Sequence, residues 1–416
     1  MSQLIKFLSV LQFCVLIAAQ RTALDSPGNL MLYGQVRRLL FRAFVDRTSN
    51  RRSSGDNILP NTQEEIPANV PFPCNVTGGR SPRVPTSVHR LRPGDIDVIG
   101  SIGDSLTAGN AIFATNLLEI AIENRGVSGS SGGQGNWRTY LTLPNILKEF
   151  NPKLFGYALG DSYTAHSASQ FNVAEIGAMS RDMPFMAQYL VNKIKKDPRV
   201  DMKNHWKMIT FMIGNNDFCT NICNIPSPWS IVDDHKKDLI KTLRYLRDNL
   251  PRTYVSLILP PHLKVLVDTT QGRGIFRCYV LTTVECPCLI GLKNLSKRPL
   301  YYEVIKSWQK MEADVAEYPE FHTEDFTVEV LPGIKQVTIP LAEDGYPDLS
   351  YMAYDCFHVS QKANALYGNI LWNNLMEPHG NKSTDWYPMM KKFLCPTAKK
   401  PYLVTRENSR RSNNLT

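Results

Sequence analysis

The 416-residue sequence lacks features that mark several large classes of protein. Its 47 Lys and Arg residues outnumber its 38 Asp and Glu residues, yet no stretch gathers about five or six basic residues as a nucleic-acid-binding tail does. The excess charge is diffuse, with at most a weak preference for anionic surfaces such as phospholipid headgroups. No repeat of roughly 20 to 50 residues is visible, which argues against solenoids and propellers. Hydrophobic residues make up 43% of the chain, so a large buried core is expected.

Long apolar runs are also missing. The run from Phe7 to Ala19 follows Lys6 and is broken only by Ser9 and Gln12. A membrane-spanning helix needs roughly 20 apolar residues, so this run predicts a secretory signal peptide of residues 1–19 rather than an anchor. The polar, basic end of the chain resembles neither a GPI signal nor a stop-transfer helix. We therefore expect a secreted, extracellular protein without a transmembrane anchor.

The cysteine content agrees with export. One of the nine cysteines, Cys14, lies inside the predicted signal peptide, which leaves eight. An even number in an oxidising compartment predicts four disulfides, whose connectivity the sequence leaves open. A zinc site is the alternative, because Cys219 with Cys223 and Cys286 with Cys288 form close pairs. Their spacing differs from the usual two intervening residues, so disulfides are favoured.

Four sequons become usable for N-glycosylation if the chain is exported. They begin at Asn75, Asn294, Asn381 and Asn414, and the first three are expected on surface loops.

The pattern of apolar residues changes along the chain. The apolar residues at 30–45 have the spacing of a helix. Residues 46–95 are polar, which predicts a segment that wraps over the surface rather than a domain. Short apolar runs then alternate with long helical patterns. Strands are predicted at Asp97 to Ile102, Phe171 to Ala174, Met208 to Ile213, Tyr254 to Leu259 and Thr327 to Leu331. Helices are predicted at Pro184 to Lys196, Ile231 to Asn249, Tyr301 to Tyr318 and Gln361 to Leu375. Apolar strands, each followed by a helix, indicate an α/β fold with a parallel sheet that binds ligands at the carboxyl ends of its strands.

A serine follows the first predicted strand in the turn Gly103-Asp104-Ser105-Leu106. Gly103 permits a sharp turn, and the Ser105 N–H would face the cleft, where it can stabilise an oxyanion. An ordinary Asp-Ser helix cap is the alternative explanation of these four residues. The GxSxG signature of the α/β-hydrolases is absent.

A base and an acid for this serine lie near the end of the sequence. Asp355-Cys356-Phe357-His358 precedes the last predicted helix, so one short loop could hold the imidazole against the carboxylate while its other nitrogen faces Ser105. Two further strand ends offer hydrogen-bond donors for an oxyanion, at Gly214-Asn215-Asn216-Asp217 and at Gly177. An Asn-rich turn would explain the first of these alone.

Together these ordered blocks resemble those of the GDSL lipases, also called SGNH hydrolases. Phrases such as Asn124-Arg125-Gly126-Val127-Ser128, Arg181-Asp182-Met183-Pro184 and Leu371-Trp372-Asn373-Asn374 resemble the animal phospholipase B group within that superfamily. The resemblance runs from about Pro71 to Asn408.

The resemblance implies a flavodoxin-like three-layer α/β/α fold and ester hydrolysis without a metal or an organic cofactor. It makes Ser105 the nucleophile, His358 the base and Asp355 the residue that orients it. The Ser105 N–H, the Gly177 N–H and the Asn216 side chain would form the oxyanion hole. Three further residues, Asp104, Gly214 and Asp217, would support the site.

The resulting hypothesis is a secreted phospholipase B-like serine esterase that cleaves fatty acyl esters of glycerophospholipids and lysophospholipids at a micelle or membrane surface. We expect a signal peptide at 1–19, a helix and surface segment at 20–95, the catalytic domain at 96–378 and a partly packed tail at 379–416. One alternative keeps the machinery but acts on other lipid esters or on acetyl esters. The other is a catalytically silent lipid-binding relative, which the intact Ser105, Asn216, Asp355 and His358 argue against.

Overall fold

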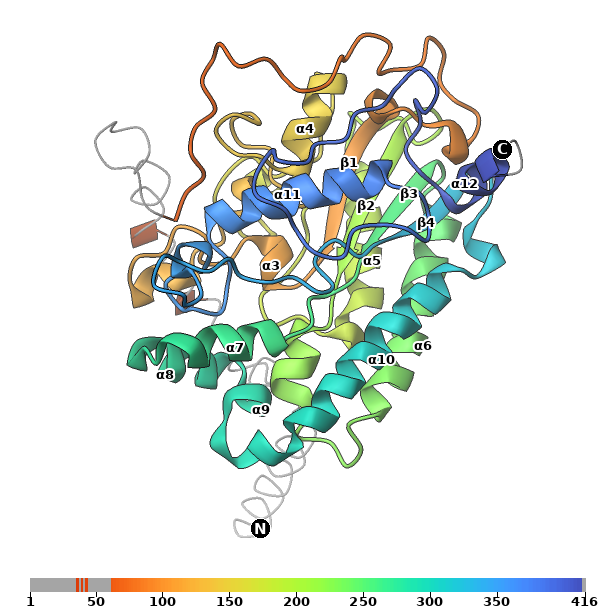
Figure 1. The fold of residues 1–416 in the computed structure, drawn as a ribbon. Coiled ribbons are helices and arrows are strands. Elements are labelled where there is room, and N and C mark those ends of the chain that lie inside the picture. The colour runs from red at the N-terminus through yellow and green to blue at the C-terminus, as the bar shows by residue number, and fades with distance from the viewer. Residues whose placement is uncertain (1–34, 37–38, 40–41, 44–60, 414–416) are drawn as a thin grey trace, which may run out of the picture.

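The structure is a computed structural model that describes residues 61–413 together with residues 35, 36, 39, 42 and 43 (Figure 1). The predicted signal peptide and most of the helix predicted at 30–45 lie outside the described residues. No helix within the described part of the chain has the length and apolar character needed to cross a membrane.

Four parallel strands form the central sheet, in the order β1-β2-β3-β4. They are β1 Ile96–Gly103, β2 Trp206–Met212, β3 Thr253–Ile258 and β4 Phe326–Leu331. Nearly every strand residue is buried, as a parallel sheet covered on both faces requires. The predictions at these four strands are confirmed.

The fifth strand prediction, Phe171 to Ala174, is wrong. This segment lies beside β1 but makes only an isolated parallel bridge, between Ser101 and Asn172. Backbone hydrogen bonds still join the segment to β1, from Ser101 N–H to the Phe171 carbonyl and from Val173 N–H to the Ser101 carbonyl. The carbonyl groups of Asn172 and Ala174 accept hydrogen bonds from the Arg125 guanidinium. The segment is therefore held between β1 and a side chain distant in sequence, without forming an extended strand.

Helices cover both faces of the sheet, which gives the three-layer α/β/α arrangement (Figure 1). One layer holds α5 Met183–Lys196, α6 Ser230–Asn249 and α10 Arg298–Ala316, with α6 packed between the other two. The other layer holds α4 Leu143–Phe150 and α11 Gln361–Met376, which pack on each other. The four predicted helices correspond to α5, α6, α10 and α11 and are confirmed.

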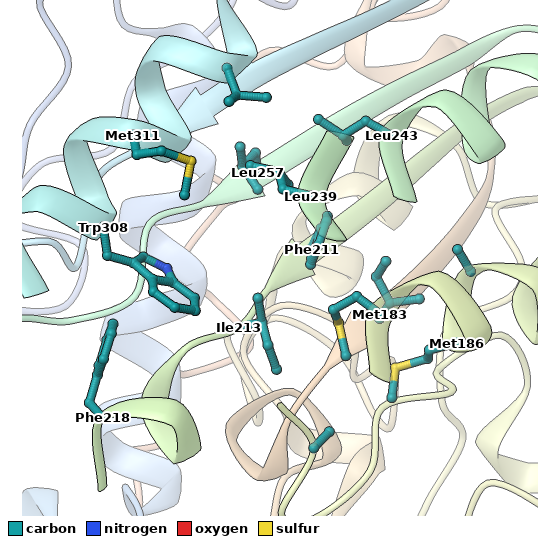
Figure 2. Close-up of a cluster of buried hydrophobic side chains, with 14 of the residues drawn as sticks. Met183, Met186, Phe211, Ile213, Phe218, Leu239, Leu243, Leu257, Trp308 and Met311 are labelled. Atoms are coloured by element: carbon teal, nitrogen blue, oxygen red, sulfur yellow. The ribbon is translucent and has the colours of Figure 1, made fainter. Parts of the chain in front are cut away.

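The buried side chains of the strands alternate between these two layers, because successive residues of a strand point to opposite faces. Phe211, Ile213 and Leu257 join the cluster between the sheet and α5, α6 and α10, where Figure 2 shows them facing residues such as Met183 and Trp308. Met208, Met212 and Tyr254 join the second cluster, against α4 and α11. The sheet is thereby fixed from both sides and holds its carboxyl ends in place.

Several shorter helices were not predicted from the sequence. They are α4, described above, together with α3 Ser105–Ala108, α7 Lys264–Arg273, α8 Phe276–Glu285, α9 Pro287–Ile290 and α12 Arg406–Asn413.

Four disulfides join all eight cysteines outside the predicted signal peptide, as predicted. The pairs are Cys74–Cys395, Cys219–Cys286, Cys223–Cys288 and Cys278–Cys356. The two close pairs of the zinc alternative are thus bonded to each other as disulfides.

Candidate active site

Ser105 lies in the turn between β1 and α3. Gly103 has a φ of +155°, and a Cβ there would lie 2.5 Å from the Met212 carbonyl oxygen of the neighbouring strand. Asp104 caps α3, because its Oδ1 accepts a hydrogen bond from the Leu106 N–H at 3.0 Å. The helix-cap explanation of this turn is therefore correct for Asp104, and the cap places Ser105 at the first position of the helix.

The structure brings Ser105, His358 and Asp355 together. His358 Nε2 lies 2.8 Å from Ser105 Oγ, and His358 Nδ1 lies 2.7 Å from Asp355 Oδ2. A carboxylate only accepts hydrogen bonds, so Nδ1–H donates to Asp355, and in the neutral imidazole Nε2 is free to accept the Ser105 proton.

The loop that carries Asp355 and His358 is held by its own backbone. Asp355 Oδ1 accepts hydrogen bonds from the N–H groups of Phe357 and His358, both at 2.9 Å. Cys356 has a left-handed φ of +58° and is bonded to Cys278 of α8. The next helix, α11, begins two residues after the histidine and is capped by Ser360. These constraints fix the imidazole before substrate arrives.

Charges around His358 control its proton affinity. Burial disfavours the imidazolium, but Asp355, with Glu285 and Asp104, outweighs it and raises the pKa of His358 to about 9. For Asp355, burial favours the neutral acid, but the charge and hydrogen bond of His358 prevail and lower its pKa. The imidazolium–carboxylate pair is thus favoured, so His358 binds a proton strongly and the neutral imidazole predominates only at alkaline pH.

Glu285 is a member of the site that the sequence did not indicate. Its Oε2 lies 3.6 Å from His358 Nδ1, and burial raises its pKa to about 8. Ligand atoms of Glu285, Asp355 and His358 lie within 4.8 Å of one another, the one grouping among the described residues that could hold a metal ion. Because His358 Nδ1 is already hydrogen-bonded to Asp355, we read the group as part of the serine site. No motif surrounds Glu285 in the sequence. It reaches the site from α8, which is distant in sequence from Ser105 and His358.

The predicted oxyanion donors lie at the same edge of the sheet. The segment leading to Gly177 runs beside β1, where Glu175 N–H donates to the Gly103 carbonyl. Asn216 follows β2, and its Nδ2 donates to the Ala178 carbonyl at 2.9 Å. An amide NH₂ has two hydrogens, so the second can still serve a substrate oxygen.

The predicted supporting residues brace these turns. Gly214 has a φ of +128°, and a Cβ there would meet Phe218 at 3.0 Å. Asp217 accepts the Ser180 N–H at 3.1 Å, and burial raises its pKa to about 8. Burial also raises the pKa of Asp104, to about 6.

Asn215, which the sequence analysis left without a role, connects two strand ends. Its Nδ2 donates to Asp104 Oδ2 at 2.9 Å, so the turn after β2 is tied to the turn after β1. Asn215 and Ser105 also line the same cavity.

That cavity is mainly apolar. Beyond Ser105 and Asn215, its walls come mostly from aliphatic and aromatic side chains of α7 and of the loops after β3 and β4. They include Leu263, Leu266, Ile334, Val337, Met352 and Phe357. A hydrocarbon chain is the type of group that such walls bind.

Arg125 is a second residue whose role the sequence did not reveal. It is fully buried and pairs with Glu123 at 2.7 Å. Its guanidinium also donates to the carbonyl groups of Asn172 and Ala174. Arg125 therefore holds the segment that leads to Gly177. In the sequence, the only indication that Arg125 matters was its position in a phrase that resembles the phospholipase B group.

A second serine–histidine–carboxylate arrangement lies elsewhere in the fold. Ser180 Oγ is 2.7 Å from His235 Nδ1, and His235 Nε2 is 2.9 Å from Glu312 Oε1. Burial lowers the pKa of His235 and raises that of Glu312, which favours the neutral form of both. His235 and Glu312 are wholly buried, and Ser180 does not line the cavity that contains Ser105. This arrangement is therefore a structural network.

The sequons differ in exposure. Asn75 and Asn381 are exposed on loops, in agreement with their predicted positions. Asn294 is not on the surface. It is 3% exposed and lies in a short helix, from which its Nδ2 donates to the Pro287 carbonyl. The prediction of a surface position there is wrong, because a pattern of three residues carries no information about burial. Asn414 lies outside the described residues.

The comparison with protein families agrees with this geometry. The model of the GDSL-like lipase/acylhydrolase family matches residues 99–371, a range that contains Ser105, Asn216 and the loop of Asp355 and His358. The chain belongs to the GDSL-like lipase/acylhydrolase family. Membership places it among the carboxylic ester hydrolases.

Curated relatives of this GDSL hydrolase include membrane-associated phospholipase B1 of Homo sapiens, which is 37% identical over 337 residues. That match covers 79% of this chain and 23% of the human protein. The Mus musculus protein of the same name is 33% identical over 377 residues, covering 89% of this chain and 25% of the relative. The chain therefore spans about a quarter of the length of these relatives.

Among solved structures, a putative GDSL-like lipase from Parabacteroides merdae aligns with 16% identity and a TM-score of 0.31. The alignment covers 70% of this chain and 98% of that one.

Proposed function

We propose that this chain is a phospholipase B-like serine esterase that hydrolyses fatty acyl esters of glycerophospholipids and lysophospholipids. One observation carries the proposal: Ser105, hydrogen-bonded to His358, opens onto an apolar cavity. The relatives named phospholipase B1 support the same substrate class.

The proposed mechanism is acyl transfer through Ser105. His358 Nε2 accepts the hydroxyl proton as Ser105 Oγ attacks the ester carbonyl, and Asp355 stabilises the imidazolium that forms. His358 then protonates the departing alcohol. Water, deprotonated by the same imidazole, attacks the acyl-enzyme and releases the fatty acid.

Negative charge on the carbonyl oxygen would be stabilised by the Ser105 N–H, the Gly177 N–H and the second hydrogen of Asn216 Nδ2. Asp104, through its cap and its bond to Asn215, would keep Ser105 and the Asn216 turn at a fixed separation. No metal or organic cofactor enters this mechanism.

We also propose that the chain is secreted, glycosylated at exposed Asn75 and Asn381, and active at a lipid surface. The support is the predicted signal peptide at 1–19 and four disulfides, which persist in oxidising compartments.

Fatty-acid release from phosphatidylcholine micelles tests the substrate, with a chelator present and a soluble acetyl ester assayed in parallel. The wild-type protein is expected to release fatty acid and lysophospholipid and then to consume the lysophospholipid, whereas Ser105→Ala releases neither. Hydrolysis of the acetyl ester alone would move the substrate to small esters. Binding of lipid without any hydrolysis would favour a silent lipid-binding relative.

A further inference from the structure

Helix α8 exposes large apolar side chains on its outer side. Its inner side carries Cys278, Thr282 and Glu285, of which the first two are buried. Its outer side carries Phe276 and Val284, whose exposed fractions are 80% and 73%, with Val280 at 40%. A surface helix in water normally turns its apolar side toward the core, so this face is built to meet an apolar medium.

The inner side of α8 is attached to the active site. Cys278 is bonded to Cys356, and Glu285 Oε2 lies 3.6 Å from His358 Nδ1. The Arg277 guanidinium lies 4.2 Å from the ring centre of Tyr354, on the same loop. The helix before α8, α7, lines the cavity that contains Ser105. Anything that binds the outer side of α8 is therefore held next to the site.

The segment that follows α8 continues the exposed apolar character and adds positive charge. Helix α9 packs on α8, and the short helix after it exposes Leu292 and Leu295 beside the exposed Lys293 and Lys297. In the sequence from 274 to 300 there are four basic residues and one acidic residue: Arg277, Lys293, Lys297 and Arg298 against Glu285. Figure 1 shows α7, α8 and α9 together at one end of the molecule, away from the sheet.

We propose that this α8 face, made of Phe276, Val280, Val284, Leu292 and Leu295, docks on the surface of an anionic phospholipid membrane. The apolar side chains enter the boundary between headgroups and acyl chains, and the lysines contact the lipid phosphates. The inference deepens the proposed function, because it explains how a lipid could leave a membrane beside Ser105. It can nevertheless be tested without catalysis.

Vesicle sedimentation tests the docking, with vesicles of equal parts phosphatidylcholine and phosphatidylserine. The Ser105→Ala protein serves as the parent, so the lipids stay intact whether or not the enzyme cleaves them. Adding Phe276→Ser with Val284→Ser is expected to weaken binding at least about tenfold. The matched control is Phe185→Ser on α5, a different helix, where a phenylalanine is 72% exposed, and binding should not change. Equal binding by all three proteins, or no binding by the parent, would overturn the proposal.

A second pair of substitutions, Lys293→Gln with Lys297→Gln, leaves the apolar residues in place. It should weaken binding to the mixed vesicles but not to vesicles of phosphatidylcholine alone, and equal loss on both would contradict the charge contribution. With Ser105 intact, the Phe276→Ser, Val284→Ser protein should hydrolyse a monomeric soluble ester at the wild-type rate, which shows that it is folded.

Two further results separate this inference from its rivals. If a second copy of the chain covers the face, gel filtration will find a dimer that Phe276→Ser dissociates, and the docking proposal fails. If the parent binds vesicles while the enzyme with Ser105 releases no fatty acid, the docking proposal stands and the proposed function fails.

Discussion

Access to the cavity, rather than burial, distinguishes Ser105 from Ser180, because each serine is 4% exposed. Ser105 and Ser180 make similar hydrogen bonds, at 2.8 and 2.7 Å, but only Ser105 lines the apolar cavity. The sequence predicts Ser105 as the nucleophile because it follows an apolar strand and belongs to ordered blocks that resemble those of the GDSL lipases, and that role stays a prediction. It could not indicate Glu285, which no motif marks. It also gave Asn215 no role, although Asn215 lies in the block from Gly214 to Asp217, because its partner Asp104 is distant in sequence.

Asn216→Ala tests the oxyanion hole at single-residue scale. The side chain donates one hydrogen to Ala178, so the fold loses one hydrogen bond, whereas the transition state loses a donor. We expect kcat to fall by roughly 10² to 10³ with little change in KM, measured on a soluble ester. Thermal unfolding is the control for folding, and wild-type rates would remove Asn216 from the site.

The pH profile tests the contact between Glu285 and His358. Catalysis needs neutral His358, whose pKa is raised to about 9, so kcat/KM should rise with pH toward that value. Because the pKa of Glu285 is about 8, its carboxyl is charged only in the alkaline range, where its charge helps to retain the imidazole proton. Glu285→Gln should therefore match the wild type near neutral pH and be more active above about pH 8, reaching its plateau earlier. A midpoint that is unchanged or moved upward would contradict this assignment.

At the scale of elements, periodicity predicted those helices and strands whose apolar side faces the core. Helix α8 escaped because its apolar side faces outward, and α7 and α9 are short elements in the same connection between β3 and α10. Phe171 to Ala174 resembled a strand because three of its four residues are apolar. Its contact with the Arg125 side chain, which binds two of its carbonyl groups, could not be found from local sequence.

Arg125→Lys tests whether that guanidinium holds the Gly177 segment. A lysine has one ammonium group and cannot reach Glu123 and the carbonyl groups of Asn172 and Ala174 together. We expect the free energy of unfolding to fall by about 3 kcal/mol, from denaturant titration, and kcat to fall as well. Arg244→Lys, in an exposed pair with Glu320, is the control and should change neither. A stable Arg125→Lys protein with normal kcat would refute the role.

At the scale of the whole molecule, the two ends of the described chain are tied together. Cys74 is bonded to Cys395, and Leu403 N–H donates to the Leu91 carbonyl. The sequence predicted four disulfides from an even count in an exported chain. The pairing itself depends on the three-dimensional approach of segments that are distant in sequence.

Removing the Cys74–Cys395 disulfide tests this closure. Its sequence separation of 321 residues means that it restricts the unfolded chain strongly, so Cys74→Ser with Cys395→Ser should lower the free energy of unfolding by about 2–5 kcal/mol. The kcat of the folded protein should not change, because neither cysteine lies near Ser105. Cys278→Ser with Cys356→Ser provides the contrast and should lower kcat as well, since it releases the His358 loop. Equal effects of the two pairs on kcat would contradict this distinction.

The most direct test of the account is to identify the serine that becomes covalently modified. The protein is treated with a fluorophosphonate carrying a long alkyl chain, and the adduct is located by peptide mass spectrometry. We predict one adduct, on Ser105, formed at a rate that His358→Ala greatly reduces. An adduct on Ser180, or undiminished ester hydrolysis after Ser105→Ala, would contradict the account.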